Sequence, residues 1–108
     1  MANTNMVEEI SGNHFEEKIA KGSFIVDFFA DWCMPCLMMS PIVEEMAEKF
    51  KKIKFLKANL DDNQKLAEKF NVMSIPTLIF FKNGREVNRI TGCLPADVLE
   101  EKIREFCK

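Results

Sequence analysis

Residues 23–41 read SFIVDFFADWCMPCLMMSP and contain an abrupt change of hydrophobic pattern. The segment from Ser23 to Ala30 is a nearly continuous apolar run, rich in aromatic and β-branched residues, which is typical of a strand buried on both faces. From Met38 onward the apolar residues recur every four positions, which is typical of an amphipathic helix. The stretch therefore predicts a buried strand that leads into a long helix, with a kink at Pro41.

Similar segments alternate along the rest of the chain. In chain order we expect a short strand at 7–10, a helix capped by Asn13 and ended by Gly22, a strand at 53–58, a helix capped by Asp61 or Asp62, strands at 77–81 and 86–91, and a helix from about Pro95. Asn83-Gly84 lies between the last two strands and indicates a hairpin. The order β-α-β-α-β-α-β-β-α predicts an α/β fold of three layers, with helices on both faces of a central mixed sheet. The early alternation implies parallel strands, and the hairpin adds an antiparallel edge.

Length and composition limit the classes of function. The 108 residues predict a single domain over 1–108, and 47% hydrophobic with 30% charged residues is typical of a soluble globular chain. The net charge is −2 and no basic block occurs, so neither nucleic acid nor a membrane is an expected partner. Residues 1–9 lack the pattern of a signal peptide, and no apolar stretch is long enough to span a membrane, which favours a cytoplasmic protein.

Two of the four cysteines, Cys33 and Cys36, form a C-x-x-C motif where the buried strand ends and the long helix begins. Unpaired N–H groups and the positive end of the helix dipole stabilise a thiolate at such a position. Cys36 follows one helical turn later, within reach of a disulfide with Cys33. The motif therefore predicts thiol–disulfide exchange, with Cys33 as the exposed attacking sulfur and Cys36 as the resolving thiol.

Asp27 interrupts the apolar run, and a carboxylate there is costly unless it is paired, solvated or protonated. We expect it to lie beneath Cys36 and to exchange a proton with it, with Lys57 in the neighbouring strand as a charge partner. The competing interpretation is a carboxylate at a frayed strand end.

A structural metal site is the main alternative for the two cysteines. It needs two further ligands, and Cys93, Cys107 and His14 are not spaced like a second pair, so we expect no metal. Clustered methionines suggest copper, but methionine at helical spacing is more typical of core packing.

The segments VDFFADWCMPC (26–36), KANLDDN (57–63) and SIPTLIFFKNG (74–84), with Pro41 and Gly92, resemble the thioredoxin family over roughly residues 7–107. The resemblance implies the thioredoxin fold, with about five strands and four helices. It implies a redox-active disulfide, Cys33–Cys36, in an oxidoreductase with no bound cofactor that serves electron transport and cell redox homeostasis. The implied partners are a thioredoxin reductase and disulfide-containing target proteins, and we expect a monomer.

The resemblance also implies roles for single residues. Asp27 and Lys57 fall on the buried proton-transfer pair of the family. Pro76 would be cis and would face the cysteine pair, although most X-Pro bonds are trans. The residues that would border the docking surface for partner peptides are Trp32, Met34, Pro35, Ile75, Pro76 and Gly92.

The chain departs from the commonest family sequence at Met34, usually Gly, at Leu37, often basic, and at Phe29, often Trp. The departures at Met34 and Leu37 affect the reduction potential and the pairing with the reductase. Two other functions remain as alternatives: a glutaredoxin-like, glutathione-dependent oxidoreductase and a non-catalytic binding or metal module. Trp32 and Asp27 favour the thioredoxin type over the glutaredoxin type. The intact C-x-x-C motif argues against a non-catalytic module.

Overall fold

The computed structural model describes residues 6–107 and contains one five-stranded mixed sheet. The elements are β1 (Val7–Glu9), α1 (Phe15–Lys18), β2 (Ser23–Phe29), α2 (Met34–Lys49), β3 (Lys54–Asn59), the 3₁₀ turn η2 (Leu60–Asp62), α3 (Gln64–Lys69), β4 (Thr77–Lys82), β5 (Arg85–Thr91) and α4 (Ala96–Phe106). The predicted order of strands and helices is confirmed.

The strands lie in the order β1-β3-β2-β4-β5. β1, β3 and β2 are parallel, whereas β4 is antiparallel to β2 and β5 is antiparallel to β4. The hairpin therefore does more than add an edge, because its first strand lies inside the sheet. All residues of β4 except Lys82 are buried and need cover on both sides, while the mostly exposed β5 tolerates the edge.

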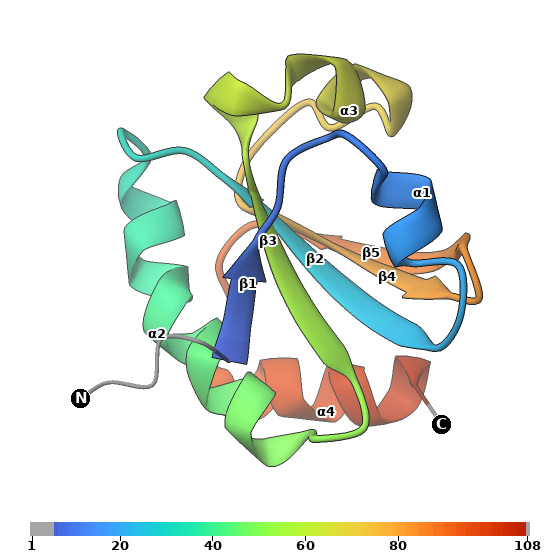
Figure 1. Cartoon of the computed structure of the whole chain (residues 1–108). Coiled ribbons are helices and arrows are strands. Elements are labelled where there is room, and N and C mark those ends of the chain that lie inside the picture. Colours follow the sequence, from blue (N-terminus) through green and yellow to red (C-terminus); the bar gives the residue numbers. More distant parts are fainter. Residues whose placement is uncertain (1–5, 108) are drawn as a thin grey trace.

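Helices cover both faces of the sheet (Figure 1). One hydrophobic cluster fills the space between the sheet and the helices on each face. Ile25 and Phe80 pack with residues of α2 and α4, whereas Val26 and Ile79 pack with residues of α1 and α3. Successive residues of each central strand thus point to opposite faces, as the period of two requires. Asp27 follows Val26 and points to the α2 side.

The hairpin between β4 and β5 forms at the predicted dipeptide. Asn83 and Gly84 have φ of 50° and 84°, the positive values that a type I′ turn requires at both central positions. Asn83 also accepts a hydrogen bond through Oδ1 from the N–H of Gly22, at 2.9 Å. This turn is therefore joined to the segment that leads into β2.

The predicted helix caps were wrong in two places. His14, not Asn13, is the N-cap of α1, and it adopts a left-handed conformation without a side-chain cap. Asn63, not Asp61 or Asp62, precedes α3, because those two aspartates form η2 instead. No helix in residues 6–107 is long and apolar enough to cross a membrane.

Candidate active site

Cys33 lies at the junction that the sequence indicates. β2 ends at Phe29, and Cys33 is the N-cap of α2, with an extended backbone. Its Sγ accepts a hydrogen bond from the backbone N–H of Cys36 at 3.2 Å, and its carbonyl oxygen accepts the N–H of Leu37 at 3.1 Å. Pro35 occupies the first turn, where backbone N–H groups have no partner within the helix, so its missing N–H costs no hydrogen bond. The first turn of α2 therefore directs an N–H donor at the Cys33 sulfur.

Cys33 and Cys36 form a disulfide, with their Cα atoms 5.2 Å apart. Both residues are buried, with exposed fractions of 6% and 3%. Phe29, Leu60 and Ile75 pack around the pair, and the Ile75 carbonyl oxygen lies 3.9 Å from Cys33 Sγ. The expectation of an exposed attacking sulfur was wrong for this oxidised form, because these apolar neighbours cover Cys33 nearly as well as Cys36.

Asp27 is buried in the middle of β2, with 5% of its surface exposed. Its partners in register are Lys57 in β3 and Leu78 in β4, and Leu78 belongs to the cluster beneath α2 and α4. Its Oδ1 atom has no hydrogen-bond partner among the described residues. The frayed strand end is therefore ruled out, since Asp27 lies inside a fully paired strand.

Burial raises the pKa of Asp27 from 3.8 to about 7, and the positive charge of Lys57 opposes part of this rise. Lys57 is half-buried, and its Nζ lies 5.7 Å from the centre of the Phe29 ring. Within residues 6–107 no hydrogen bond or ion pair joins Lys57 to Asp27. Asp27 is therefore a carboxyl group that gains and loses a proton near neutral pH, on the sheet face that α2 covers.

The segment from Ile75 to Thr77 begins β4 and contains a cis Ile75–Pro76 bond, as the resemblance implies. The Pro76 carbonyl accepts a hydrogen bond from the N–H of Gly92 at 2.8 Å, which joins this segment to the end of β5. Gly92 has φ of 100°, and the space beside its Cα is open. Pro76 itself is buried, whereas Ile75 is half-buried.

Trp32 and Met34 flank Cys33, and each is 67% exposed. The indole Nε1–H of Trp32 donates to Asp61 Oδ2 at 3.1 Å. The backbone N–H of Asp61 in turn donates to Asn59 Oδ1 at 2.9 Å. η2 therefore holds the indole N–H through one hydrogen bond, which was not predicted because Asp61 was expected to cap a helix.

Leu37, Met38 and Met73 are also exposed, and the sequence singled out only Leu37 among them, as a departure from the family. Leu37 and Met38 follow Met34 at i+3 and i+4, so the sequence already placed them on one side of α2. Met38 was expected in the buried stripe of the helix, and this prediction was wrong. Met39 is buried instead, on the side of α2 that also buries Cys36 and Val43.

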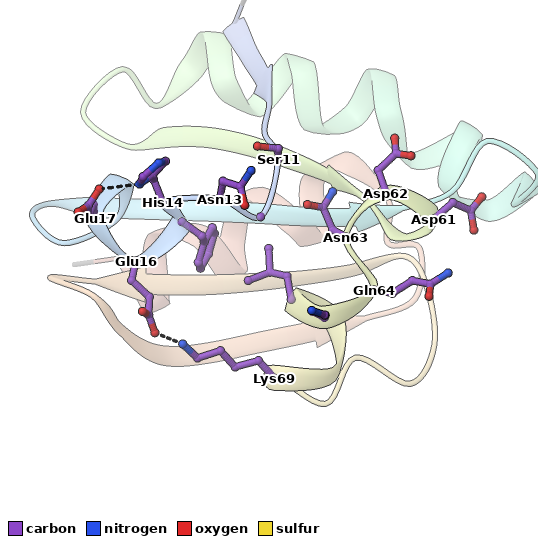
Figure 2. A pocket seen from close by; sticks show the side chains of 14 residues that line it. Ser11, Asn13, His14, Glu16, Glu17, Asp61, Asp62, Asn63, Gln64 and Lys69 are labelled. Atoms are coloured by element: carbon purple, nitrogen blue, oxygen red, sulfur yellow. Dashed lines mark hydrogen bonds and ion pairs between the residues drawn. The ribbon is translucent and has the colours of Figure 1, made fainter.

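A pocket in the described chain lies away from the disulfide (Figure 2). It has a volume of about 800 Å³ and is lined by residues 11–17, 61–66 and 69. An ion pair links Glu16 to Lys69, and a hydrogen bond joins His14 to Glu17 at the start of α1. None of the predicted site residues lines it. No group of three or more His, Cys, Asp or Glu side chains within residues 6–107 is arranged to hold a metal ion.

Comparisons with known proteins agree with this geometry. The sequence pattern of the thioredoxin family matches residues 6–105. The thioredoxin of Chlamydia pneumoniae is 45% identical over 100 residues, which cover 93% of this chain and 98% of that protein. The thioredoxin of Staphylococcus saprophyticus is 41% identical, covering 92% and 96%. A solved thioredoxin structure from Malassezia sympodialis has a TM-score of 0.84 at 27% identity, covering 94% of this chain and 91% of that one.

Proposed function

Because the chain belongs to the thioredoxin family of thiol–disulfide oxidoreductases, we propose that it reduces target disulfides by a two-step exchange in which Cys33 attacks and Cys36 resolves. The observation that carries this proposal is the Cys33–Cys36 disulfide at the N-terminus of α2. The chemistry needs no bound cofactor, since the redox-active group is part of the chain.

The first step is attack by the Cys33 thiolate on one sulfur of a target disulfide. The target S–S bond breaks, a mixed disulfide forms, and the departing target thiolate takes up a proton. The N–H of Cys36, which lies 3.2 Å from Cys33 Sγ, favours negative charge on that sulfur. No comparable N-cap position supports a thiolate on Cys36, which lies inside the first turn.

In the second step Cys36 loses its proton and attacks the Cys33 sulfur of the mixed disulfide. The internal disulfide forms, and the second target thiolate leaves and is protonated. Two electrons and two protons thus pass from the dithiol to the target. A thioredoxin reductase then returns the two electrons to Cys33 and Cys36.

Asp27 is the group that we assign to the proton transfer from Cys36. Its pKa of about 7 lets it accept and release a proton at neutral pH, which is the requirement for a general base. It lies on the face of β2 covered by α2, the helix in which Cys36 is buried. Lys57 tunes this carboxyl group, because its positive charge keeps the pKa from rising further.

The docking surface of this proposal surrounds the disulfide. One part of it consists of Trp32, Met34 and Pro35. The other part consists of Ile75 and Pro76, which precede β4, and Gly92, which follows β5. The exposed side chains of Trp32 and Met34 and the open space beside Gly92 support this assignment.

The proposal extends to the domain organisation, oligomeric state, location and partners of the protein. The chain acts as a single domain over residues 1–108 and as a monomer in the cytoplasm. There it serves electron transport and cell redox homeostasis. Its partners are a thioredoxin reductase and disulfide-containing proteins, and neither nucleic acid nor a membrane takes part.

An insulin-reduction assay with dithiothreitol as electron source tests the function. The parent should accelerate precipitation of the insulin B chain, and Cys33→Ser should show no acceleration. Cys93→Ser is the matched control, because Cys93 is an exposed free cysteine outside the pair and its loss should leave the rate within about twofold. A Cys33→Ser protein as active as the parent would refute the proposal.

A further inference from the structure

Three large apolar side chains lie exposed on the first two turns of α2. Met34, Leu37 and Met38 are 67%, 52% and 64% exposed. Their spacing of i, i+3 and i+4 puts them on one side of the helix. The opposite side carries buried residues of α2, among them Cys36 and Met39. We call the surface formed by Met34, Leu37 and Met38 the α2 face.

The composition around the α2 face is unusual for a surface helix. Residues 32–43 (WCMPCLMMSPIV) contain no Asp, Glu, Lys, Arg or His, and the first charged residue is Glu44. An exposed helical surface normally carries charged or polar side chains. Contiguous exposed apolar residues of this kind mark interaction sites, and flexible methionines adapt to partners of different shape.

The position of the α2 face indicates what covers it. Met34 lies between the two cysteines, and Leu37 follows Cys36 directly, so the face adjoins the disulfide. Any protein disulfide that reacts must bring a sulfur atom to bonding distance of Cys33 or Cys36. The residues beside the target cysteine then come within reach of the exposed side chains on the first turns of α2.

The charges around the site restrict the partner further. Asp31 and Asp61 are exposed beside Trp32. The α2 face offers no cation to pair with a carboxylate, and covering a carboxylate with apolar side chains costs free energy. Acidic residues beside the target disulfide are therefore unfavourable, whereas large apolar residues remove apolar surface from water on both proteins.

We propose that the α2 face selects targets: it binds disulfide-containing polypeptides that carry large apolar side chains next to the attacked cysteine and disfavours those with acidic ones. This inference rests on the proposed function, because it requires that targets react at the Cys33–Cys36 pair. It assigns to Leu37 and Met38 a role in specificity, with no part in the bond exchange itself.

Two synthetic peptides test the selection. Each carries one intramolecular disulfide, and they differ only at the residues flanking the cysteines, which are leucine in one and glutamate in the other. The second-order rate constant for oxidation of the reduced protein is followed by the fluorescence of Trp32, the single tryptophan. The parent should react about tenfold faster with the leucine peptide, a ratio that corresponds to about 1.4 kcal/mol. Equal rates for the two peptides would overturn the proposal.

The double variant Leu37→Gln/Met38→Gln makes the α2 face polar while keeping side chains that suit a helix. For this variant the rate constant with the leucine peptide should exceed that with the glutamate peptide by about twofold or less. A general loss of activity lowers both rate constants alike and therefore leaves their ratio unchanged. Val87→Gln is the matched control, since Val87 is a half-exposed apolar residue on β5, and it should keep the parent ratio. A double variant with the parent ratio would overturn the proposal.

Two further measurements separate the alternatives. Sedimentation of the parent should show one species at the monomer mass. A dimer that the double variant dissociates would identify the α2 face as a self-interface and overturn the proposal. If the peptides oxidise the reduced Cys33→Ser variant at the parent rate, the proposed function itself is wrong, whatever ratio of rates the parent shows between the two peptides.

Discussion

Asp27 is the residue whose chemistry depends most on its position in the fold. On an exposed surface it would be an ordinary carboxylate, but in β2 it lies in an apolar environment with one unpartnered oxygen. Burial of the charged form is the largest influence on its pKa, and the charge of Lys57 offsets only part of it. A group of this kind destabilises the fold when it ionises, which is consistent with a role in proton transfer.

The first prediction concerns stability and pH. The folded pKa of Asp27 is about 7 and the ordinary value is 3.8, so the folded state binds the proton more tightly. Stability of the oxidised parent should therefore fall as pH rises from about 4 to 7 and level off above that range. Asp27→Asn should match the parent near pH 4 and exceed it above pH 7 by at most roughly 4 kcal/mol.

Urea unfolding at several pH values measures this difference. Asp62→Asn is the control, since Asp62 is exposed in η2 and should change the pH profile little. If Asp27→Asn keeps the same decline between pH 4 and 7 as the parent, burial of the carboxyl group is not its cause.

The second prediction concerns the role of Asp27 in the reaction. With asparagine in its place no side chain accepts the Cys36 proton, and resolution of the mixed disulfide must use water. The rate of insulin reduction at pH 7 should fall by about 100-fold, the lower end of the range for general base catalysis. The deficit should shrink at higher pH, where the Cys36 thiol ionises unaided. An equal deficit at pH 7 and pH 9 would assign Asp27 a structural role only.

At the level of the elements, the end of β5 depends on the conformation of Gly92. Its φ of 100° is rarely adopted by residues with a side chain, although a methyl group would meet no atom within 4 Å. Its N–H bonds the carbonyl of Pro76, so this conformation joins the ends of β4 and β5 beside the disulfide. The glycine is therefore required by backbone conformation and not by lack of space.

Gly92→Ala should accordingly destabilise the protein by about 1–2 kcal/mol, the usual cost of a strained left-handed residue. Thermal unfolding should show this as a midpoint lower by several degrees for a chain of this length. Thr91→Ala, at the neighbouring exposed position in β5, is the control and should have a smaller effect. A Gly92→Ala protein as stable as the Thr91→Ala protein would contradict the backbone argument.

The elements differ in how well their sequence predicts them. Asn83-Gly84 predicted its hairpin because the turn type itself selects those residues. The caps of α1 and α3 were mispredicted because several polar residues are adjacent at each helix start, and only tertiary contacts choose among them. Met38 and Met39 are a similar case, since both are apolar and the phase of α2 depends on which side meets the sheet.

For the whole molecule, the sequence predicted the order of the elements better than the contacts between them. β2 leads directly into α2, as expected, so Asp27 lies in the strand before the helix that Cys33 caps. The burial of Cys33 depends on Leu60 and Ile75, which come from distant parts of the chain, and no local pattern indicates that contact. The position of β4 inside the sheet likewise follows from packing on both its faces.

The central claim is that Cys33 attacks and Cys36 resolves, and trapping of the mixed disulfide tests it most directly. Reduced Cys36→Ser and Cys33→Ser proteins are each mixed with a disulfide-containing target, and the covalent adducts are identified by mass spectrometry without reductant. We expect Cys36→Ser to accumulate an adduct through Cys33 and Cys33→Ser to accumulate at least tenfold less, since the remaining Cys36 thiol lacks the N-cap position. Equal accumulation in both variants, or an adduct formed only through Cys36, would contradict the central claim.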